Sequence, residues 1–236
     1  KVDLTVLEEV RKEFEQEKQE LTVKLEEQVH ELMGDRPINL NSPEQLSWII
    51  YSRKVNDKPV WSAAYEDRVS NTQHKDNIRS LTTKLYKQKA ERCNECYGSG
   101  QIRKTRKDGT PHKNTNKCPT CSSTGFLYTN KKDFAGLKFI APDYKWASAN
   151  GFSTSKGNLI YLEGIARSRG MHDAEVFLQR VRRLSALDTY LSSFVEGIAT
   201  HVKPDGKLHV RLLQHRTGTG RLSGADPNMQ NMPRGG

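Results

Sequence analysis

Long hydrophobic runs are absent from this sequence, and apolar side chains are scarce throughout it. Of its 236 residues, 34% are hydrophobic and 8% aromatic, and the mean hydropathy is −0.78. No apolar run approaches the ~18 residues that a membrane-spanning helix needs, and no signal peptide is visible, so we expect no membrane partner. So small a supply of apolar side chains predicts an elongated molecule with much solvated surface.

Cysteine is equally restricted, since all four cysteines lie between Cys93 and Cys121. A disulfide framework would staple the whole chain, so this clustering favours a metal site and a reducing compartment. We therefore expect a cytoplasmic location. The chain begins at Lys1 rather than at methionine, and we expect it to be a piece of something longer.

Acidic residues are concentrated at the N-terminal end. Residues 1–33 hold ten acids and five bases, a net charge of −5, which leaves +15 on the other 203 residues for a total of +10. A basic body of this size favours a polyanionic partner such as nucleic acid. A merely soluble basic surface would have the same composition, and only a motif can separate the two.

Helical periodicity is clear at the N-terminal end. Apolar residues at three-four spacing predict a long amphipathic helix over residues 3–33, capped by Asp3 and ended by Gly34. A second helix is predicted to open at its N-cap Ser42, with Gln45 completing a capping box.

The rest of the chain alternates between helical and irregular patterns. We predict helices over residues 76–89, 153–165 and 172–200, and irregular structure over 55–75 and 139–152. Trp61 is the one large apolar anchor of the first irregular stretch. A Lys-Pro-Asp-Gly turn at residues 203–206 is predicted to lead into a strand over 208–213, where apolar side chains alternate.

Two C-x2-C pairs form a candidate metal site. The ligands would be Cys93, Cys96, Cys118 and Cys121, with the spacing C-x2-C-x21-C-x2-C. Two such pairs supply the four thiolates of a tetrahedral Zn²⁺ shell, which has no open position and is therefore structural. The alternatives are two disulfides or four free thiols. The pattern is similar to the zinc-binding CxxCxGxG repeats of J-domain co-chaperones, with Ser123 in place of one glycine.

The segment around these cysteines is strongly basic. Residues 84–132 hold twelve Lys and Arg against three acids. We expect it to contact the DNA backbone, because attraction to phosphates needs only charge. The side chains expected to make this contact are Arg103, Lys104, Arg106 and Lys107. The alternatives are a dock for an accessory protein and a solvated elaboration without a partner.

The C-terminal stretch carries the most specific pattern. It reads TGRLS over residues 219–223 and DPNMQNMP over residues 226–233. This resembles the hallmark of the family A DNA polymerases, the relatives of bacterial DNA polymerase I, in which TGRLSS is followed by PNLQNIP. The departures are Gly224 for the second serine, and Met229 and Met232 for leucine and isoleucine. Methionine keeps the apolar bulk, so packing should survive.

Two further segments resemble the same family and occur in the family's order. They are NLNSPEQL at residues 39–46 and FSTS at residues 152–155. Three landmarks in order make a chance resemblance very improbable.

The resemblance implies a mainly α fold, in which an elongated helical thumb with a zinc-ribbon-like insertion precedes the first β-strands of an α+β palm. The implied parts are thumb helices at residues 1–54, the insertion with its zinc site at 55–150, further thumb helices at 151–203 and the start of the palm at 204–236. Some phage relatives carry a thumb insertion that binds a processivity partner. The resemblance therefore implies a phage-type polymerase of DNA replication, with a processivity factor as a further candidate partner.

The resemblance also implies roles for individual residues. Arg221 would reach the minor groove at the primer terminus, Asn228 and Gln230 would face the nascent duplex, and Thr219 would bind DNA beside them. Minor-groove acceptors lie at similar places in every Watson–Crick pair, so a guanidinium there senses pair geometry without reading sequence. The alternative for Arg221 is an ordinary surface arginine beside a turn.

Catalytic residues are not expected among these 236 residues. Nucleotidyl transfer uses Mg²⁺ ions held by carboxylates, and the resemblance places those aspartates and the fingers helix beyond this segment. Asp205 and Asp226 are better explained as turn formers. The chain alone should hold primer–template DNA without extending it, and should need the remaining palm and fingers as a partner. The competing interpretation is a stand-alone zinc-dependent DNA-binding accessory factor.

Overall fold

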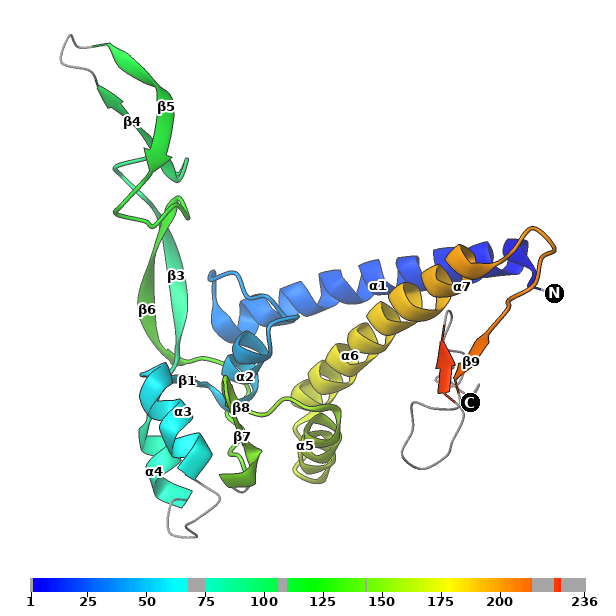
Figure 1. The fold of residues 1–236 in the computed structure, drawn as a ribbon. Helices are drawn as coiled ribbons and strands as arrows, with labels where there is room; N and C mark the ends of the chain where they lie inside the picture. Colours follow the sequence, from blue (N-terminus) through cyan, green and yellow to red (C-terminus); the bar gives the residue numbers. More distant parts are fainter. Residues whose placement is uncertain (1, 68–74, 106–109, 143, 214–222, 226–236) are drawn as a thin grey trace. The chain divides into compact units, whose positions relative to one another are not determined.

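The computed structural model describes residues 2–67, 75–105, 110–142, 144–213 and 223–225. Its helices are α1 (Leu4–Met33), α2 (Pro43–Tyr51), α3 (Lys58–Asp67), α4 (Lys75–Ser80), α5 (Lys156–Ser168), α6 (His172–Thr189) and α7 (Glu196–His201), with the 3-10 turn η1 (Tyr144–Trp146) and the π-helical turn η2 (Tyr190–Val195) (Figure 1). None of these helices is long and apolar enough to cross a membrane.

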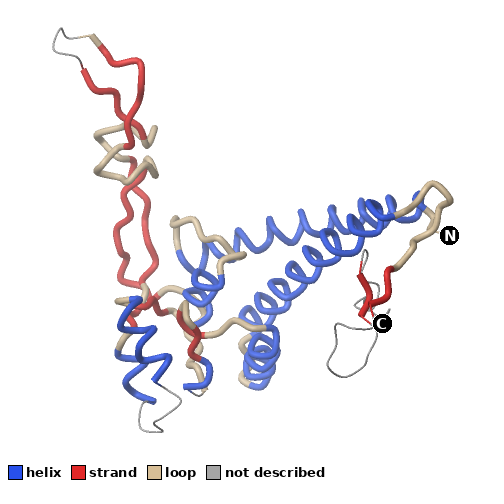
Figure 2. The backbone as a smooth tube through the Cα atoms, viewed as in Figure 1, coloured by secondary structure: helices blue, strands red, loops and turns tan. Residues whose placement is uncertain are grey.

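The strands of the described part are short and pair two by two. They are β1 (Arg53–Val55), β2 (Thr82–Lys84), β3 (Tyr86–Arg92), β4 (Gln101–Thr105), β5 (Pro111–Lys117), β6 (Phe126–Phe134), β7 (Ala147–Ser148), β8 (Gly151–Phe152), β9 (Arg211–Leu213) and β10 (Ser223–Ala225). The antiparallel pairs are β1–β2, β3–β6, β4–β5, β7–β8 and β9–β10 (Figure 2). The predicted mainly α fold class is therefore confirmed, and the strands of the described part form small antiparallel sheets.

The chain divides into two compact units. The first unit combines Lys1–Leu25 with Val176–Gly236, and the second spans Glu26–Glu175.

In the first unit, α1 runs antiparallel to the helix formed by α6, η2 and α7. Arg183 donates two hydrogen bonds to the carboxylate of Glu17, at 2.7 and 2.6 Å. Phe14 contacts Tyr190 with ring centroids 5.8 Å apart. The buried apolar side chains of this unit are Leu25, Phe177, Leu178, Val181, Leu184, Leu187, Val195 and Leu213. Both long helices were predicted from their periodicity, and Asp3 caps α1 by accepting from the amide of Thr5 at 2.9 Å.

The predicted turn at residues 203–206 is present. The Gly206 amide donates to the Lys203 carbonyl at 2.8 Å, and the Asp205 carboxylate accepts from the Lys207 amide at 3.0 Å. Asp205 is thus a turn former, as expected. The strand begins at Arg211, three residues later than predicted, and pairs with β10 so that Leu212 faces Gly224.

The second unit has a core that joins segments distant in sequence. Trp61 is buried, donates its indole N–H to the Ser148 carbonyl at 2.7 Å and meets the Phe152 ring edge-on, with centroids 5.5 Å apart. The irregular structure predicted for residues 55–75 is wrong over α3. Asp57 caps this helix by accepting from the Val60 amide at 3.0 Å, which is an N-terminal signal that the periodicity did not reveal.

The helix predicted over residues 76–89 is also wrong beyond Ser80. After α4 the chain turns into β2 and β3, which are completed by partners far along the sequence: β2 pairs with β1, and β3 pairs with β6. Local periodicity cannot detect such partners. The α2 start is confirmed in part. Ser42 accepts from the Gln45 amide at 3.4 Å, but the Gln45 side chain accepts from the Asn39 amide at 2.7 Å, so the capping box is not completed at Ser42.

The β3–β6 ribbon is fixed to the C-terminal end of α1. The Asp35 amide donates to the Gln88 carbonyl at 2.9 Å, and the Asp35 carboxylate accepts from the Ala90 amide at 2.8 Å. Two residues after β6 ends, the Gly136 amide donates to the Leu32 carbonyl at 2.9 Å. The base of the ribbon is therefore tied to helical structure on both sides. The helix predicted from residue 153 is present as α5, which begins after its N-cap Ser155.

Candidate metal centre and nucleic-acid surface

Two similar loops lie between the β3–β6 pair and the β4–β5 pair (Figure 1). We call residues 93–100, which join β3 to β4, the first knuckle, and residues 118–125, which join β5 to β6, the second knuckle. Antiparallel pairing of β3 with β6 and of β4 with β5 brings the start of each loop next to the end of the other. The strands thus place two C-x2-C pairs, separated by 21 residues in sequence, face to face.

The four predicted cysteines converge on one point. Their Sγ atoms all lie within 4.8 Å of one another, with Cys93 and Cys118 3.9 Å apart and Cys96 and Cys121 3.6 Å apart. A Zn–S bond of about 2.3 Å in a tetrahedron gives sulfur separations of about 3.8 Å. Both pairs are too far apart for a disulfide, whose sulfurs lie about 2.05 Å apart, and all four thiols are free. The disulfide alternative is therefore wrong for this structure.

The sulfurs are enclosed and receive backbone donors. Cys93 and Cys118 have no solvent exposure, and Cys96 and Cys121 are 5% exposed. The Gly100 amide donates to the Cys96 sulfur and the Gly125 amide to the Cys121 sulfur, each at 3.3 Å. Thiolates bound to a metal retain negative charge, which such amides stabilise.

Gly100 and Gly125 also allow the two knuckles to approach closely. Both have left-handed backbones, with φ of +69° and +78°. A Cβ on Gly100 would lie 2.3 Å from the Ser123 carbonyl oxygen, and one on Gly125 would lie 2.3 Å from the Gly98 carbonyl oxygen. Each knuckle therefore requires glycine at this position because the backbone of the other knuckle passes there.

The thiol environment favours partial ionisation of the cluster. Burial raises the pKa of Cys96, but hydrogen bonds from the Gly100 amide and from neighbouring thiols outweigh it and lower that pKa to about 7. The Cys121 amide lowers the pKa of Cys118, yet burial and the thiols of Cys121 and Cys93 raise it to about 11. The first thiolate thus forms readily, and its negative charge opposes ionisation of a second thiol. A bound cation would remove that repulsion, because a metal ligand thiol is deprotonated.

Sequence reasoning missed one contact that joins the knuckles. The Glu95 carboxylate accepts a hydrogen bond from the Thr120 hydroxyl, so the middle residues of the two C-x2-C pairs are linked. The signal is present in the sequence, because Glu95 and Thr120 occupy the same position within their pairs.

The basic residues expected to contact DNA are only partly within the described residues. Arg103 lies on β4 and is exposed, and Lys104 follows it on the same strand. Arg106 and Lys107 lie outside the described residues. Further basic residues described from the end of β2 to β6 are Lys84, Lys87, Lys89, Arg92, Lys113, Lys117, Lys131 and Lys132. Positive charge therefore extends beyond the four predicted contacts.

The residues expected at the minor groove lie outside the described residues. They are Thr219, Arg221, Asn228 and Gln230. Of the hallmark stretch, the structure describes Ser223–Ala225, which form β10 against β9. Gly224, the departure from the family pattern, pairs there with Leu212.

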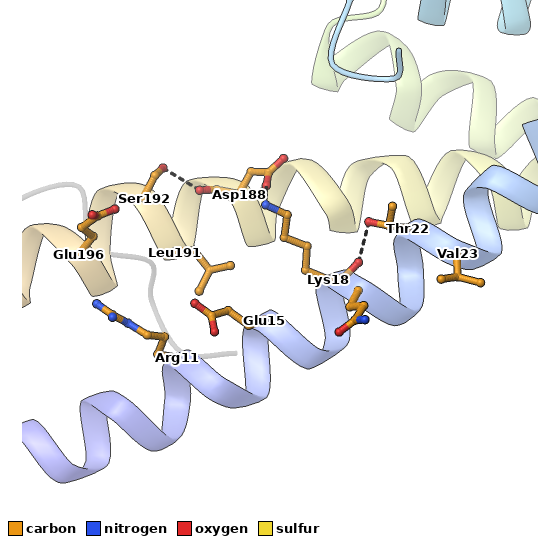
Figure 3. A pocket seen from close by; sticks show the side chains of 10 residues that line it. Arg11, Glu15, Lys18, Thr22, Val23, Asp188, Leu191, Ser192 and Glu196 are labelled. Carbon is orange, nitrogen blue, oxygen red and sulfur yellow. Dashed lines mark hydrogen bonds and ion pairs between the residues drawn. The ribbon is translucent and has the colours of Figure 1, made fainter. Parts of the chain in front are cut away.

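A groove of about 740 Å³ lies in the first unit between α1 and the α6–η2–α7 helix (Figure 3). Its lining residues are Arg11, Glu15, Lys18, Gln19, Thr22, Val23, Asp188, Leu191, Ser192 and Glu196. Lys18 and Asp188 form an ion pair at 2.6 Å. The lining holds bases and acids together, so its charge does not favour a polyanionic ligand.

Several curated proteins are similar to parts of this chain. DNA polymerase I of Bacillus subtilis (strain 168) is 38% identical over 84 residues, which are 35% of this chain and 8% of that protein. The thermostable DNA polymerase I of Thermus filiformis is 39% identical over 82 residues, 34% of this chain and 9% of that protein. DNA polymerase I of Lactococcus lactis subsp. cremoris (strain MG1363) is 50% identical over 42 residues, 18% of this chain and 5% of that protein.

The matched segments thus span less than a tenth of each relative's length. Among solved structures, the POL domain of Pol1 from M. smegmatis in complex with DNA primer-template and dNTP has a TM-score of 0.48 and 18% identity, over 99% of this chain and 24% of that one. No protein-family model matches the chain. Over about a third of its length, this chain is therefore similar to DNA polymerase I of Bacillus subtilis and of Thermus filiformis.

Proposed function

We propose that this chain is part of a template-directed DNA polymerase of DNA replication and that it grips primer–template duplex. The observation that carries the proposal is the 38% identity to DNA polymerase I over 84 residues. In this proposal residues 1–54 and 151–203 are thumb helices, residues 55–150 are an insertion in the thumb, and residues 204–236 begin the palm. The insertion makes a phage-type polymerase the finer proposal.

The grip would combine two kinds of contact. The body outside residues 1–33 carries +15, which attracts the phosphate backbone whatever the sequence. Thr219, Arg221, Asn228 and Gln230 would bind the duplex near the primer terminus, with Arg221 in the minor groove, where acceptors are similar in every base pair. A polymerase needs this indifference to sequence.

We propose that the four cysteines bind one structural Zn²⁺. The fit rests on the donor set and its spacing, since four enclosed sulfurs lie within 4.8 Å of one another. When bound, the ion would supply a closed tetrahedral cross-link between the two knuckles. Zinc analysis of the purified protein should give about one ion per chain, the stoichiometry of a single four-thiolate site. A fully folded, zinc-free insertion with four titratable thiols would contradict the proposal.

The catalytic Mg²⁺ of such an enzyme would be held outside this chain. Among the described residues, the four cysteines are the one group of three or more metal-ligating side chains that converge. Hard Mg²⁺ prefers oxygen ligands, so the cysteine site does not fit it. We therefore propose that the remaining palm and fingers, on the same or another polypeptide, supply the carboxylates.

The insertion has two candidate partners, and we favour the DNA backbone over a processivity factor. Arg103 is exposed on β4, and the residues beside it are basic. Replacing Lys104, Arg106 and Lys107 with alanine should lower duplex affinity and reduce its salt dependence, because fewer phosphates are neutralised. If affinity and salt dependence both stay unchanged, the segment is better explained as a dock for an accessory protein.

Primer extension tests the proposed function as a whole. With Mg²⁺ and four nucleotides, the chain alone should hold a labelled primer–template without extending it, and extension should appear when the remaining palm and fingers are added as a second polypeptide. Extension by contaminant-free chain alone would contradict our assignment of the carboxylates. A chain that binds duplex but gives no synthesis with that complement would favour a stand-alone zinc-dependent accessory factor instead.

A further inference from the structure

The two knuckles are related by an approximate twofold repeat. The Cys93 amide donates to the Gly125 carbonyl at 2.9 Å, and the Cys118 amide donates to the Gly100 carbonyl at 3.0 Å. The hydroxyls of Ser99 and Thr124 make matching pairs of hydrogen bonds to the carbonyls on either side of them. Each residue of the first knuckle therefore has a counterpart 25 positions later.

The two halves of this repeat carry different exposed side chains at equivalent positions. Arg92 precedes the first knuckle, Tyr97 lies within it, and Phe126 pairs with Arg92 across the ribbon. Their counterparts in the repeat are Lys117, Ser122 and Gln101. The metal cluster needs the same backbone on both sides, so it does not explain why one side carries two aromatic rings. The difference points to a role outside metal binding.

Tyr97 is the more unusual of the two aromatic residues. It is 74% exposed, the highest value among the large apolar side chains of the described residues. Its φ of +50° is left-handed, a conformation that favours glycine, asparagine or aspartate over an aromatic residue. Its counterpart Ser122 has the same conformation, with φ of +51°, and no ring. Neither backbone preference nor burial accounts for a tyrosine at this position.

Arg92 is next to both residues, through the backbone of Tyr97 and through its strand pairing with Phe126. Its Nε donates to the Tyr97 carbonyl at 2.7 Å, and it is the direct cross-strand partner of Phe126, which is 42% exposed. Cross-strand partners lie side by side on one face of a ribbon. Among the described residues no carboxylate forms an ion pair with Arg92. We call these three residues the aromatic patch.

We propose that the aromatic patch binds unpaired nucleotides of single-stranded DNA. Exposed aromatic rings and a guanidinium suit a single strand. Its unpaired bases can stack on the rings, and the cation attracts its phosphate backbone. Paired bases are already stacked on each other, so duplex DNA would leave the rings unused. The surrounding segment, with twelve Lys and Arg against three acids over residues 84–132, complements a polyanion. The choice of DNA rests on the proposed function, whereas the recognition of unpaired bases does not.

Tyr97→Asn tests this proposal without endangering the fold. Asparagine suits the left-handed backbone, and the side chain that is lost is exposed, so circular dichroism and zinc content should match the unsubstituted chain. Affinity for an oligothymidylate of about 12 nucleotides should fall about tenfold, the scale of losing one stacked base. The salt dependence should not change, because no charge is removed. Phe126→Gln, which introduces the residue type of its counterpart, should lower the affinity in the same direction.

Ser122→Asn is the matched control on the other side of the repeat and should leave oligothymidylate affinity unchanged. A strand of abasic sites should bind the unsubstituted chain and Tyr97→Asn equally, because it has no bases to stack. If Tyr97→Asn and Phe126→Gln keep full affinity for oligothymidylate while the chain binds duplex, the inference is wrong and the proposed function stands. An equal loss on duplex contradicts the single-strand assignment, and a chain that binds neither form overturns the proposed function as well.

Discussion

Gly100 and Gly125 are important because the backbone of the opposite knuckle lies where their side chains would be. A Cβ at Gly125 would lie 2.3 Å from the Gly98 carbonyl oxygen, so Gly125→Ala should force the knuckles apart. We expect it to destabilise the chain by about 1–3 kcal/mol, the usual cost of a strained left-handed residue, and to speed zinc loss to a chelator. Gly157→Ala is the control, because no atom lies within 4 Å of its added Cβ. Equal thermal stability and zinc retention in both variants would contradict the packing argument.

Local sequence signals predicted the roles of single residues well, but they did not predict contacts between residues that are far apart in sequence. The four cysteines, Asp3 and Ser42 could be predicted because a short spacing or a helix cap involves only residues that are close in sequence. Asp35 does not, because its carboxylate accepts from the amide of Ala90, 55 residues away. The minor-groove residues came from a family motif rather than from local chemistry, and they remain a prediction, since the described residues do not include them.

At the scale of elements, the pairing of α1 with α6 should depend on pH. The hydrogen bond from Arg183 lowers the pKa of Glu17, against a smaller opposing effect of burial. The stabilisation is therefore present above the ordinary carboxyl range and is lost as pH falls through the lowered pKa of Glu17. Glu17→Gln should lower the Tm at pH 7, and this difference should shrink at pH 3. A difference that stays constant with pH would assign the effect to packing instead.

The base of the ribbon should be the first part of β3 to open when its anchor is removed. Asp35→Ala deletes the acceptor of the Ala90 amide, which now bonds at 2.8 Å. Hydrogen exchange at Ala90 should become faster, whereas exchange at Cys93, whose amide bonds to the Gly125 carbonyl, should change little. Uniform acceleration along the whole strand would show that the ribbon opens as one piece.

The elements that were predicted correctly are those whose pattern is complete within one segment. The helices α1, α5 and α6 show their apolar period locally and were found. The strands β2 and β3 were predicted as helix, because their partners β1 and β6 lie elsewhere in the sequence. The helix α3 was missed because, among its described side chains, Trp61 is the one that is buried, and it packs against residues 148 and 152.

At the scale of the whole molecule, the segment that we propose as an insertion shares a compact unit with helices that we propose as thumb, since one unit spans Glu26–Glu175. The ribbon can nevertheless be removed at its base, because the Ala135 amide donates to the Leu85 carbonyl at 3.0 Å. Replacing residues 86–134 with a short glycine-containing turn should leave a folded, zinc-free chain. It should bind duplex with weaker salt dependence, because basic residues are lost. Loss of cooperative unfolding would show that the ribbon is required for the core.

Affinity for primer–template duplex tests the central claim most directly. Fluorescence anisotropy with a labelled primer–template should show binding by the unsubstituted chain, and Arg221→Ala should weaken it about tenfold, the scale of one arginine contact in a groove. Arg211→Ala, which removes an exposed arginine from β9, controls for charge alone and should cost less. No measurable binding by the unsubstituted chain, or equal affinities for Arg221→Ala and Arg211→Ala, would contradict the proposal that this segment holds the primer end.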